Sequence, residues 1–300
     1  MRAIPVASLW SDQAAGLRAM IAPTPCRSIS LNGGRGGSGT TTLAINLAAA
    51  LAERNREVIL LDEFTGSGNA AHRMRLEQKH ELDHVLRREV TLANTLLTTE
   101  AGFSILPISA RASVLSSLNE RELTWLSAEF EQLTQYAEFL LLDTRPSASH
   151  GVPCLSLAAD DVMVIVSNSA ESLTDAYATI KLLGTEYARR DFRILVNRVD
   201  TITEAGLIFN RLKSVARQYL GDAVQMKLIG YVPEDEKLKR ASRLGRTVLD
   251  AFPDADSSHA FRQLADVMLR WRKPLNTTDS TGFLYRLVES SRLLAEQLQH

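Results

Sequence analysis

The chain has 300 residues, 45% of them hydrophobic and 23% charged, which is enough for one large α/β domain with a buried core. Its formal net charge of −1 excludes a global attraction to nucleic acid or anionic lipid, so any such contact has to be local. No apolar run approaches the ~18 residues that cross a bilayer, and the first residues lack a signal-peptide cleavage site. Cys26 and Cys154 match no metal or redox spacing, so we expect reduced thiols in a cytoplasmic protein.

The first element that the sequence predicts is a helix over residues 9–21, which ends before Pro23 and Pro25. Its apolar side chains fall on one stripe at helical spacing: Trp10, Ala14, Leu17 and Ile21. By periodicity alone, this is a small amphipathic helix that packs on its own domain.

Next come a strand at residues 28–31, a glycine-rich loop, a helix over 43–54 and a second strand at 58–62. Glycines let backbone amides approach phosphate oxygens, and the following helix directs its positive end to the same place. We therefore expect a phosphate-binding loop. Its residues are Gly34, Arg35, Gly36, Gly37, Ser38, Gly39, Thr40 and Thr41.

Two positions of this loop decide what it can do. The hydroxyl of Thr41 stands where such loops hold Mg²⁺. Thr40 stands where they carry a lysine, whose charged hydrogen bond to phosphate is worth about 1.5–3 kcal/mol. A tight strand-to-helix turn without a ligand is the alternative interpretation.

The rest of the chain alternates short β-branched runs with helical patterns, which predicts an α/β fold with a doubly wound, mostly parallel sheet flanked by helices. Further strands are expected at residues 103–106, 139–142, 162–166, 192–196 and 227–231. Further helices are expected at residues 120–136, 172–189, 204–220, 234–244 and 258–271. Asp62 and Asp143 fall at the carboxyl ends of strands, where such sheets bind ligands, although either carboxylate could instead cap a loop or a helix.

A C-terminal helix is expected over residues 283–298, after a polar stretch at 274–282. At about 100° per residue its apolar side chains share one arc. They are Phe283, Leu284, Leu287, Val288, Leu294, Ala295 and Leu298. Such a helix can lie in a membrane interface, but its arginines are balanced by glutamates, so docking on the domain or on a partner stays open.

One cationic cluster could hold nucleic acid through phosphate contacts. It consists of Lys237, Lys239, Arg240, Arg243 and Arg246. Because acidic residues precede it and the chain has no basic excess, a solvated helix face is favoured and nucleic-acid binding is not expected. Of the scattered histidines, His72, His80 and His84 are expected at the surface.

The loop at residues 34–41 resembles the deviant Walker A motif of the MinD/ParA ATPases, Gly-Lys-Gly-Gly-x-Gly-Lys-Thr, without gaps. The resemblance implies that Arg35 replaces the signature lysine, which in that family reaches the partner's nucleotide across a dimer interface. It also implies a nucleotide-dependent homodimer with ATP or ADP and Mg²⁺ as cofactor. The metal would contact Thr41 and Asp143, and the adenine ring would contact Asn197 and Pro233.

Segments outside the loop resemble one branch of that family, the flagellar number regulators of the FlhG (FleN) type. These segments are residues 171–177, 180–183, 192–197, 230–233, 235–236, 251–253 and 260–261. Taken with the loop, the matches extend over nearly the whole chain. A short motif near the start resembles the one with which these regulators engage the flagellar GTPase FlhF. It comprises Asp12, Gln13, Ala14, Leu17 and Arg18. The resemblance implies that Gln13 is offered to the water of the partner GTPase.

The function implied by this resemblance is regulation of flagellar number or placement, through nucleotide-biased association and stimulation of an FlhF-type GTPase. Other implied partners are the flagellar C-ring or a transcription regulator, and the helix over residues 283–298 would contact the membrane peripherally. We expect a cytoplasmic protein that can lie at the inner membrane or the cell pole. Residues 1–25 would form the activator helix, 26–273 the P-loop domain, and 274–300 the linker and terminal helix.

Three departures from the family pattern weaken the same reaction. Thr40 replaces the lysine, Phe64 replaces the second carboxylate of an Asp-x-Asp motif, and Ser147 replaces a glycine after Asp143. Losing a group that positions the attacking water typically costs about 10²–10⁴-fold in rate. We therefore expect weak or absent ATP hydrolysis.

If the chain is active, the candidates for catalysis are Arg35, Asp62 and Asp143. Two other functions stay open. One is an active MinD-type ATPase in which Arg35 or another cation replaces the lysine, and the other is a ParA-like DNA-partitioning protein.

Overall fold

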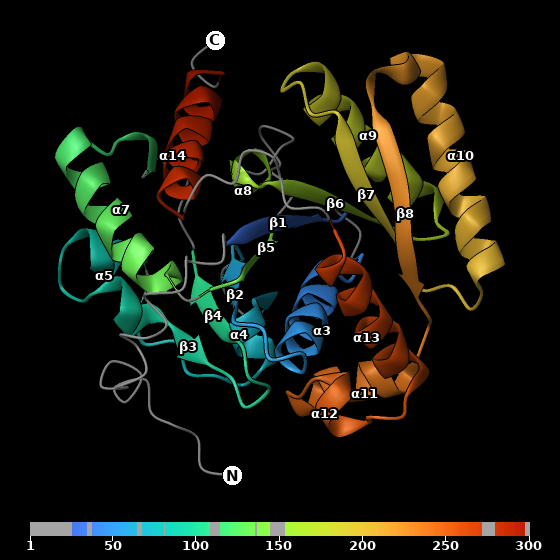
Figure 1. The fold of residues 1–300 in the computed structure, drawn as a ribbon, viewed down its shortest axis with the longest axis horizontal. Coiled ribbons are helices and arrows are strands. Elements are labelled where there is room, and N and C mark those ends of the chain that lie inside the picture. The colour runs from blue at the N-terminus through green and yellow to red at the C-terminus, as the bar shows by residue number, and fades with distance from the viewer. Residues whose placement is uncertain are drawn as a thin grey trace.

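The computed structural model describes residues 26–34, 38–64, 68–80, 82–108, 115–135, 137–144, 154–271 and 280–297. The described residues form an eight-stranded sheet in the order β3-β4-β2-β5-β1-β6-β7-β8 (Figure 1). The strands are β1 (Arg27–Asn32), β2 (Val58–Asp62), β3 (Leu97–Thr98), β4 (Ser104–Pro107), β5 (Phe139–Asp143), β6 (Asp161–Val166), β7 (Asp191–Asn197) and β8 (Gln225–Val232). The pairs are parallel except for the short antiparallel pair of β3 with β4.

Helices cover both faces of this sheet (Figure 1). One face carries α3 (Thr40–Ala52), α4 (Ala70–Arg73), α11 (Glu236–Leu244), α12 (Val248–Ala251) and α13 (Asp256–Leu269). The other face carries α5 (Leu82–Leu86), η2 (Leu92–Thr95), α7 (Glu120–Thr134), α8 (Cys154–Ala158), α9 (Ala170–Thr185), α10 (Ile202–Leu220) and α14 (Ser280–Gln297). A short turn, η3 (Gly221–Ala223), joins α10 to β8. The expected doubly wound α/β fold is confirmed.

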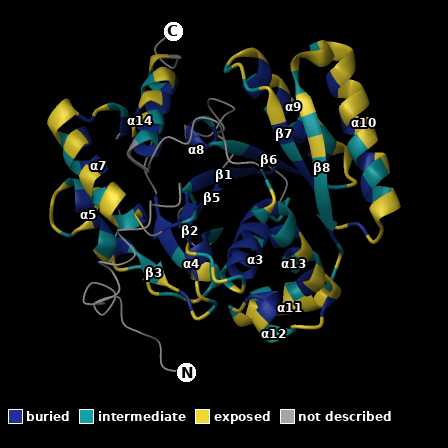
Figure 2. Cartoon of the chain, in the orientation of Figure 1, coloured by how far each residue is buried: buried dark blue, intermediate teal, exposed yellow. Residues whose placement is uncertain are grey.

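Successive residues of each strand point to opposite faces, which divides the core into separate layers. On β2, Leu60 joins the cluster beneath α3, whereas Ile59 and Leu61 join the cluster beneath α7. The central strands β1, β2 and β5 are therefore buried along their whole length, whereas the edge strands β3 and β8 and the outer sides of the helices are partly exposed (Figure 2).

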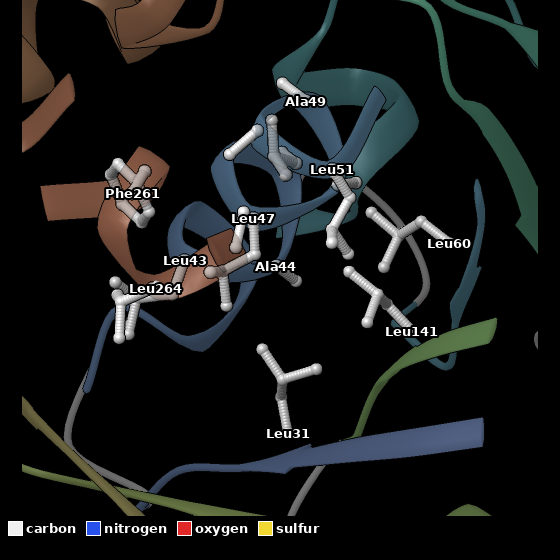
Figure 3. Packing of buried hydrophobic residues seen from close by; sticks show 14 of the residues in the cluster. Leu31, Leu43, Ala44, Leu47, Ala49, Leu51, Leu60, Leu141, Phe261 and Leu264 are labelled. Carbon is white, nitrogen blue, oxygen red and sulfur yellow. The ribbon is translucent and has the colours of Figure 1, made fainter. Parts of the chain in front are cut away.

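Helix α3 follows the glycine-rich loop and is buried along nearly its whole length. Figure 3 shows Leu43 and Leu47 of α3 packed among strand residues and Phe261 of α13. Apolar residues surround α3 on nearly every side, as is typical of a core helix. The start of α3 is thereby fixed rigidly to the sheet.

The long elements begin and end close to their predicted positions. Helix α3 starts at Thr40, three residues earlier than expected, because Gly39 takes a left-handed conformation (φ 82°) and lets the helix begin directly after the loop. Helix α11 starts at Glu236 and not at position 234, because the side chain of Asp235 caps it by accepting from the amide of Lys237. The short elements α4, α5, α8, α12 and β3 were not predicted.

Helix α14 docks on α7 and α8, so its apolar face packs against the rest of the chain (Figure 1). Phe283 stacks on Phe130 of α7 with ring centroids 5.5 Å apart, and Leu287 and Val288 are buried. Of the alternatives left open by the sequence, docking on the domain itself is the one seen here. The predicted helix over residues 9–21 lies outside the described residues.

Cys26 is free and half-buried, and burial beside Asp160 and Glu138 raises the pKa of its thiol to about 12. It therefore stays protonated at neutral pH. Of the histidines expected at the surface, His72 is exposed, whereas His80 and His84 are half-buried and their rings meet edge to face.

A cluster of charged and aromatic side chains fixes the end of α13 to the sheet. The guanidinium groups of Arg27 and Arg193 lie 5.2 Å and 4.8 Å from the ring centre of Trp271. Both also pair with Asp161, at 2.5 Å and 3.3 Å. This Trp271 clasp ties the end of α13 to the amino-terminal ends of β1, β6 and β7.

Candidate functional site

The loop between β1 and α3 requires glycine at two described positions. A β-carbon added to Gly33 would lie 1.9 Å from Ser38 Oγ and 2.0 Å from Thr40 Oγ1, two hydroxyls that are hydrogen-bonded at 2.8 Å. A β-carbon on Gly34 would lie 2.6 Å from a carboxylate oxygen of Asp175 on α9. Sequence reasoning did not identify Gly33 or Asp175 as parts of this site. The position of Gly33 directly before Gly34 is the signal that could have identified it, and nothing comparable marks Asp175. Arg35, Gly36 and Gly37 lie outside the described residues.

The first turn of α3 points into the site without a side-chain cap. Gly39 has no side-chain oxygen to offer to the first helix amides, although its carbonyl accepts from the amide of Leu43 (2.9 Å), and no acidic residue occupies the first turn. Uncapped amides at a buried helix start are a favourable environment for an anion. Thr40 and Thr41 are both buried there.

Two buried carboxylates lie beside this helix start. Asp62 and Asp143 end the adjacent strands β2 and β5 and are paired in register. Asp62 accepts hydrogen bonds from the amides of Phe64 (2.9 Å) and Ala70. Burial nevertheless raises the pKa of Asp62 to about 6, against the lowering effect of those amides.

The charged form of Asp143 has fewer stabilising contacts than that of Asp62 among the described residues. It is fully buried, and neither carboxylate oxygen has a well-formed hydrogen bond among the described residues. Burial and the charge of Asp62 raise its pKa well above the usual range, and the nearby Thr41 hydroxyl only partly offsets them. Buried polar oxygens normally have a hydrogen-bond partner or bind an ion. Carboxylate and hydroxyl oxygens are ligands that suit a hard divalent cation.

The described residues contain no group of three or more histidine, cysteine or acidic side chains that could hold a metal by themselves. Two carboxylates and a threonine hydroxyl are too few for a closed cage. They match the usual Mg²⁺ arrangement, in which phosphate and water complete the coordination. The residues present therefore fit Mg²⁺ bound together with a phosphate ligand.

Arg73, at the end of α4, also reaches this site. Its Nη1 donates to Thr42 Oγ1 (3.1 Å) in the first turn of α3, and its Nε donates to the carbonyl of Gly68 (2.9 Å). Its charge lowers the pKa of both Asp62 and Asp143. Sequence reasoning missed Arg73, because nothing in the sequence indicates where so short a helix lies.

A cavity of about 320 Å³ opens beside the loop. Asn197, the last residue of β7, and Pro233, which follows β8, both line it together with Gly39 and Thr42. The side chain of Asn197 is buried and donates to the carbonyl of Ser38 (2.8 Å). The structure therefore brings the two predicted base-contacting residues together with the loop.

Of Phe64, Ser147 and the motif of residues 12–18, the structure describes only Phe64. Phe64 is half-buried and bonds to Asp62 only through its backbone amide, so its side chain adds no carboxylate. Ser147 and the motif of residues 12–18 lie outside the described part of the chain.

Two residues of the cationic cluster on and after α11 have acidic partners in the described structure. Lys239 pairs with Glu234 (2.6 Å) and Glu236 (2.8 Å). Arg246 pairs with Asp250 (2.6 Å), and Arg240 lies over the ring of Phe252. These contacts support the interpretation of a solvated helix face.

A parallel sheet with a glycine-rich loop, an uncapped buried helix start and an acidic pair defines the class of P-loop nucleotide-binding proteins. The chain belongs to the CobQ/CobB/MinD/ParA nucleotide-binding family, whose family model matches residues 29–248. It is 32% identical to the antiactivator FleN of Pseudomonas aeruginosa over 266 residues, 88% of this chain and 94% of that protein.

Two further relatives show the breadth of the family. The flagellum site-determining protein YlxH of Helicobacter pylori is 21% identical over 80% of this chain and 81% of its own length. The septum site-determining protein MinD of Pyrococcus horikoshii, solved with Mg-ADP, is 21% identical. Its structure covers 82% of this chain and 96% of its own, with a TM-score of 0.60. The resemblance to the MinD/ParA family and its flagellar branch is confirmed. No helix among the described residues has the length and hydrophobicity needed to cross a membrane.

Proposed function

We propose that this protein regulates flagellar number or placement as a nucleotide-biased binding protein, with ATP hydrolysis weak or lost. The similarity to FleN over 88% of the chain supports the flagellar role, and the name of YlxH agrees with it. The observation that carries the nucleotide part is the buried pair of Asp62 and Asp143 beside the uncapped start of α3, in which the oxygens of Asp143 have no well-formed hydrogen bond among the described residues.

A bound ATP or ADP with Mg²⁺ would place negative charge and a divalent cation where this chain has unsatisfied groups. Amides of the loop residues 34–41 would hold the phosphates, and Thr41 and Asp143 would hold the metal. Asn197 and Pro233 would border the base in the cavity that they line. Because the charged form of Asp143 is costly without a cation, we expect Mg²⁺ to be taken up with the nucleotide.

Weak hydrolysis follows from two side chains. Thr40 bonds to Ser38 within the loop and carries no charge, so it cannot replace a lysine at that position. Phe64 offers no oxygen to orient an attacking water. A nucleotide can then act through binding, by favouring one conformation or association state over another.

Association is the proposed readout. Release of α14 would expose the apolar face that now packs on α7 and α8, and this face could contact the membrane surface peripherally. Residues 12–18 would stimulate an FlhF-type GTPase, and other surfaces would meet a flagellar C-ring or transcription-regulator partner or a second copy of the chain. The protein would act in the cytoplasm, at the inner membrane or the cell pole.

Calorimetric titration with ATP and ADP, each with Mg²⁺, tests the nucleotide part, and turnover of ATP is measured on the same sample. We expect both nucleotides to bind. We expect the turnover of ATP to be lower than that of the Thr40→Lys variant. Absence of binding would remove the nucleotide from the mechanism. Turnover equal to that of lysine-bearing relatives would favour the second candidate, an active ATPase in which another cation acts.

The partner role has a separate test. Gln13→Ala should abolish stimulation of a purified FlhF-type GTPase, while Arg18→Lys, which keeps the charge, should retain part of it. Unchanged stimulation in the Gln13 variant would exclude the activator role.

The DNA-partitioning alternative predicts salt-sensitive binding to random duplex DNA that the Arg240→Glu/Arg243→Glu variant loses. We expect no such binding, because Lys239 and Arg246, which flank these two residues, are already paired with carboxylates.

A further inference from the structure

Among the described residues of the phosphate-binding loop, no lysine or arginine side chain is present, and the usual lysine position is occupied by Thr40. A bound nucleotide would bring several negative charges next to two buried carboxylates, and position 40 carries a hydroxyl. Buried charges of one sign are costly unless a cation offsets them. A second positive group near the start of α3 is therefore expected if any phosphate binds there.

We propose that Arg73 supplies this cation, so that a guanidinium from α4 contacts the phosphate groups in place of the lysine missing at position 40. The inference rests on the proposed nucleotide binding and adds to it the residue that makes it electrostatically feasible.

The contacts of Arg73 place its guanidinium at the edge of the site. Its Nη1 lies 3.1 Å from Thr42 Oγ1. Thr42 belongs to the first turn of α3 and lines the cavity of about 320 Å³. The bond from Nε to the carbonyl of Gly68 fixes the planar group in one orientation. The side chain thus approaches the first turn of α3 from the side of α4.

The charge of Arg73 is still available to a ligand. Among the described residues it donates only to two neutral oxygens, a hydroxyl and a carbonyl, and to no carboxylate. Asp62 and Asp143 are close enough for that charge to lower their pKa values but form no ion pair with it. A guanidinium in this state retains donors for phosphate oxygens, for which its fork geometry is suited.

The other described cations nearby are directed elsewhere. Arg75 is exposed, donates to the carbonyl of Arg243 on α11 (2.8 Å) and covers Gly245. Arg243 is also exposed, and it lines a hollow of about 620 Å³ between α4 and α11 together with Arg73 and Arg75. Arg75 lies two residues from Arg73 and makes a similar carbonyl contact, so it offers a matched control.

A structural role would also explain these contacts, since Arg73 joins α4 to α3. The two roles differ in what they predict for ligands. A residue that only joins two helices affects every ligand of the site equally. A cation that contacts phosphate affects ATP and ADP but leaves adenosine unchanged.

The experiment is calorimetric titration of the full chain with ATP, ADP and adenosine, in the presence of Mg²⁺, after circular dichroism has established folding. We expect Arg73→Gln to lower the affinity for ATP and ADP by about 10- to 100-fold and to leave adenosine affinity unchanged. Arg75→Gln should bind all three ligands as the wild type does. Equal losses for ATP and adenosine, or no loss for either, would overturn the inference.

A second variant tests the exchange of cations. In Thr40→Lys/Arg73→Gln, a lysine at the usual position should restore ATP affinity to the wild-type level. This double variant also provides the test if Arg73→Gln alone does not fold. Continued loss in a folded double variant would contradict the inference. If the wild type binds none of the ligands, it is the proposed nucleotide binding that fails, and this outcome is distinct from the others.

Discussion

The guanidinium of Arg286 on α14 lies 3.0 Å from the carboxylate of Asp160, which follows α8. The same arginine donates to the carbonyl of Ala158 at the end of α8 (2.8 Å). The other oxygen of Asp160 accepts from the amide and the hydroxyl of Ser28 on β1. One carboxylate therefore connects the terminal helix to the first strand of the sheet, and α14 is held by polar contacts as well as by its apolar face.

Replacing Arg286 should loosen α14. Asp160 is nearly buried, and removing one partner of a buried charged hydrogen bond costs about 1–3 kcal/mol. For Arg286→Ala we expect hydrogen exchange of the α14 amides to accelerate by about 10- to 100-fold, with exchange in α3 unchanged. Glu296→Ala, at an exposed position of the same helix, is the control. Equal protection in both variants would show that the ion pair contributes nothing to docking.

The stack of Phe283 on Phe130 should contribute more than any exposed contact of α14. Truncating a buried aromatic side chain costs about 3–5 kcal/mol. We expect Phe283→Ala to make α14 accessible to limited proteolysis, whereas Tyr285→Ala, whose side chain is 42% exposed, leaves cleavage slow. Slow cleavage in both variants would mean that the stack is not needed for docking.

Asp143→Asn should stabilise the ligand-free protein at neutral pH. The pKa of Asp143 is raised in the folded state, so the folded protein binds the proton more tightly than the unfolded chain. Wild-type stability therefore falls as the pH rises above the ordinary value of 3.8, and the asparagine variant escapes this loss.

The measurement is chemical denaturation of both proteins without nucleotide or Mg²⁺, at acidic and at neutral pH. The stability advantage of Asp143→Asn should grow as the pH rises, and each unit of raised pKa contributes about 1.4 kcal/mol. Asp62→Asn is a less clean variant, because each carboxylate oxygen of Asp62 accepts one backbone amide and asparagine keeps only one of the two acceptors. An advantage that is constant across pH would contradict the electrostatic explanation.

Gly33→Ala should disturb the loop through steric overlap. The new methyl group would fall within 2.0 Å of the hydroxyls of Ser38 and Thr40, and overpacking of this kind typically costs about 1–3 kcal/mol. Gly206→Ala in α10 is the matched control, because nothing lies within 4 Å of its added β-carbon and alanine favours a helix. Thermal unfolding should show a lower midpoint for the first variant and an equal or higher midpoint for the second.

The sheet and its long helices could be predicted because each carries its own periodic pattern. The alternation of Ile59 and Leu60 between two core layers is local information. The sequence also indicated that Asp62 and Asp143 lie at the carboxyl ends of strands, where such sheets bind ligands, and the structure pairs them in register on adjacent strands.

Other parts of the site depend on contacts that no local pattern encodes. Helix α4 has only four residues, which is little more than one helical turn, so the approach of Arg73 to Thr42 could not be foreseen. The contact of Asp175 with Gly34 joins residues from α9 and the loop, and it exists only because the sheet brings them together. The docking of α14 was undecided for the same reason, since an apolar stripe does not specify what covers it.

The Trp271 clasp has a consequence for any release of α14. The ring of Trp271 is held by Arg27 and Arg193, which both pair with Asp161 at the start of β6, so the end of α13 is anchored to the sheet by contacts that do not involve α14. Undocking of α14 would leave this anchor in place, and the sheet would keep its order while the terminal helix exchanges one surface for another.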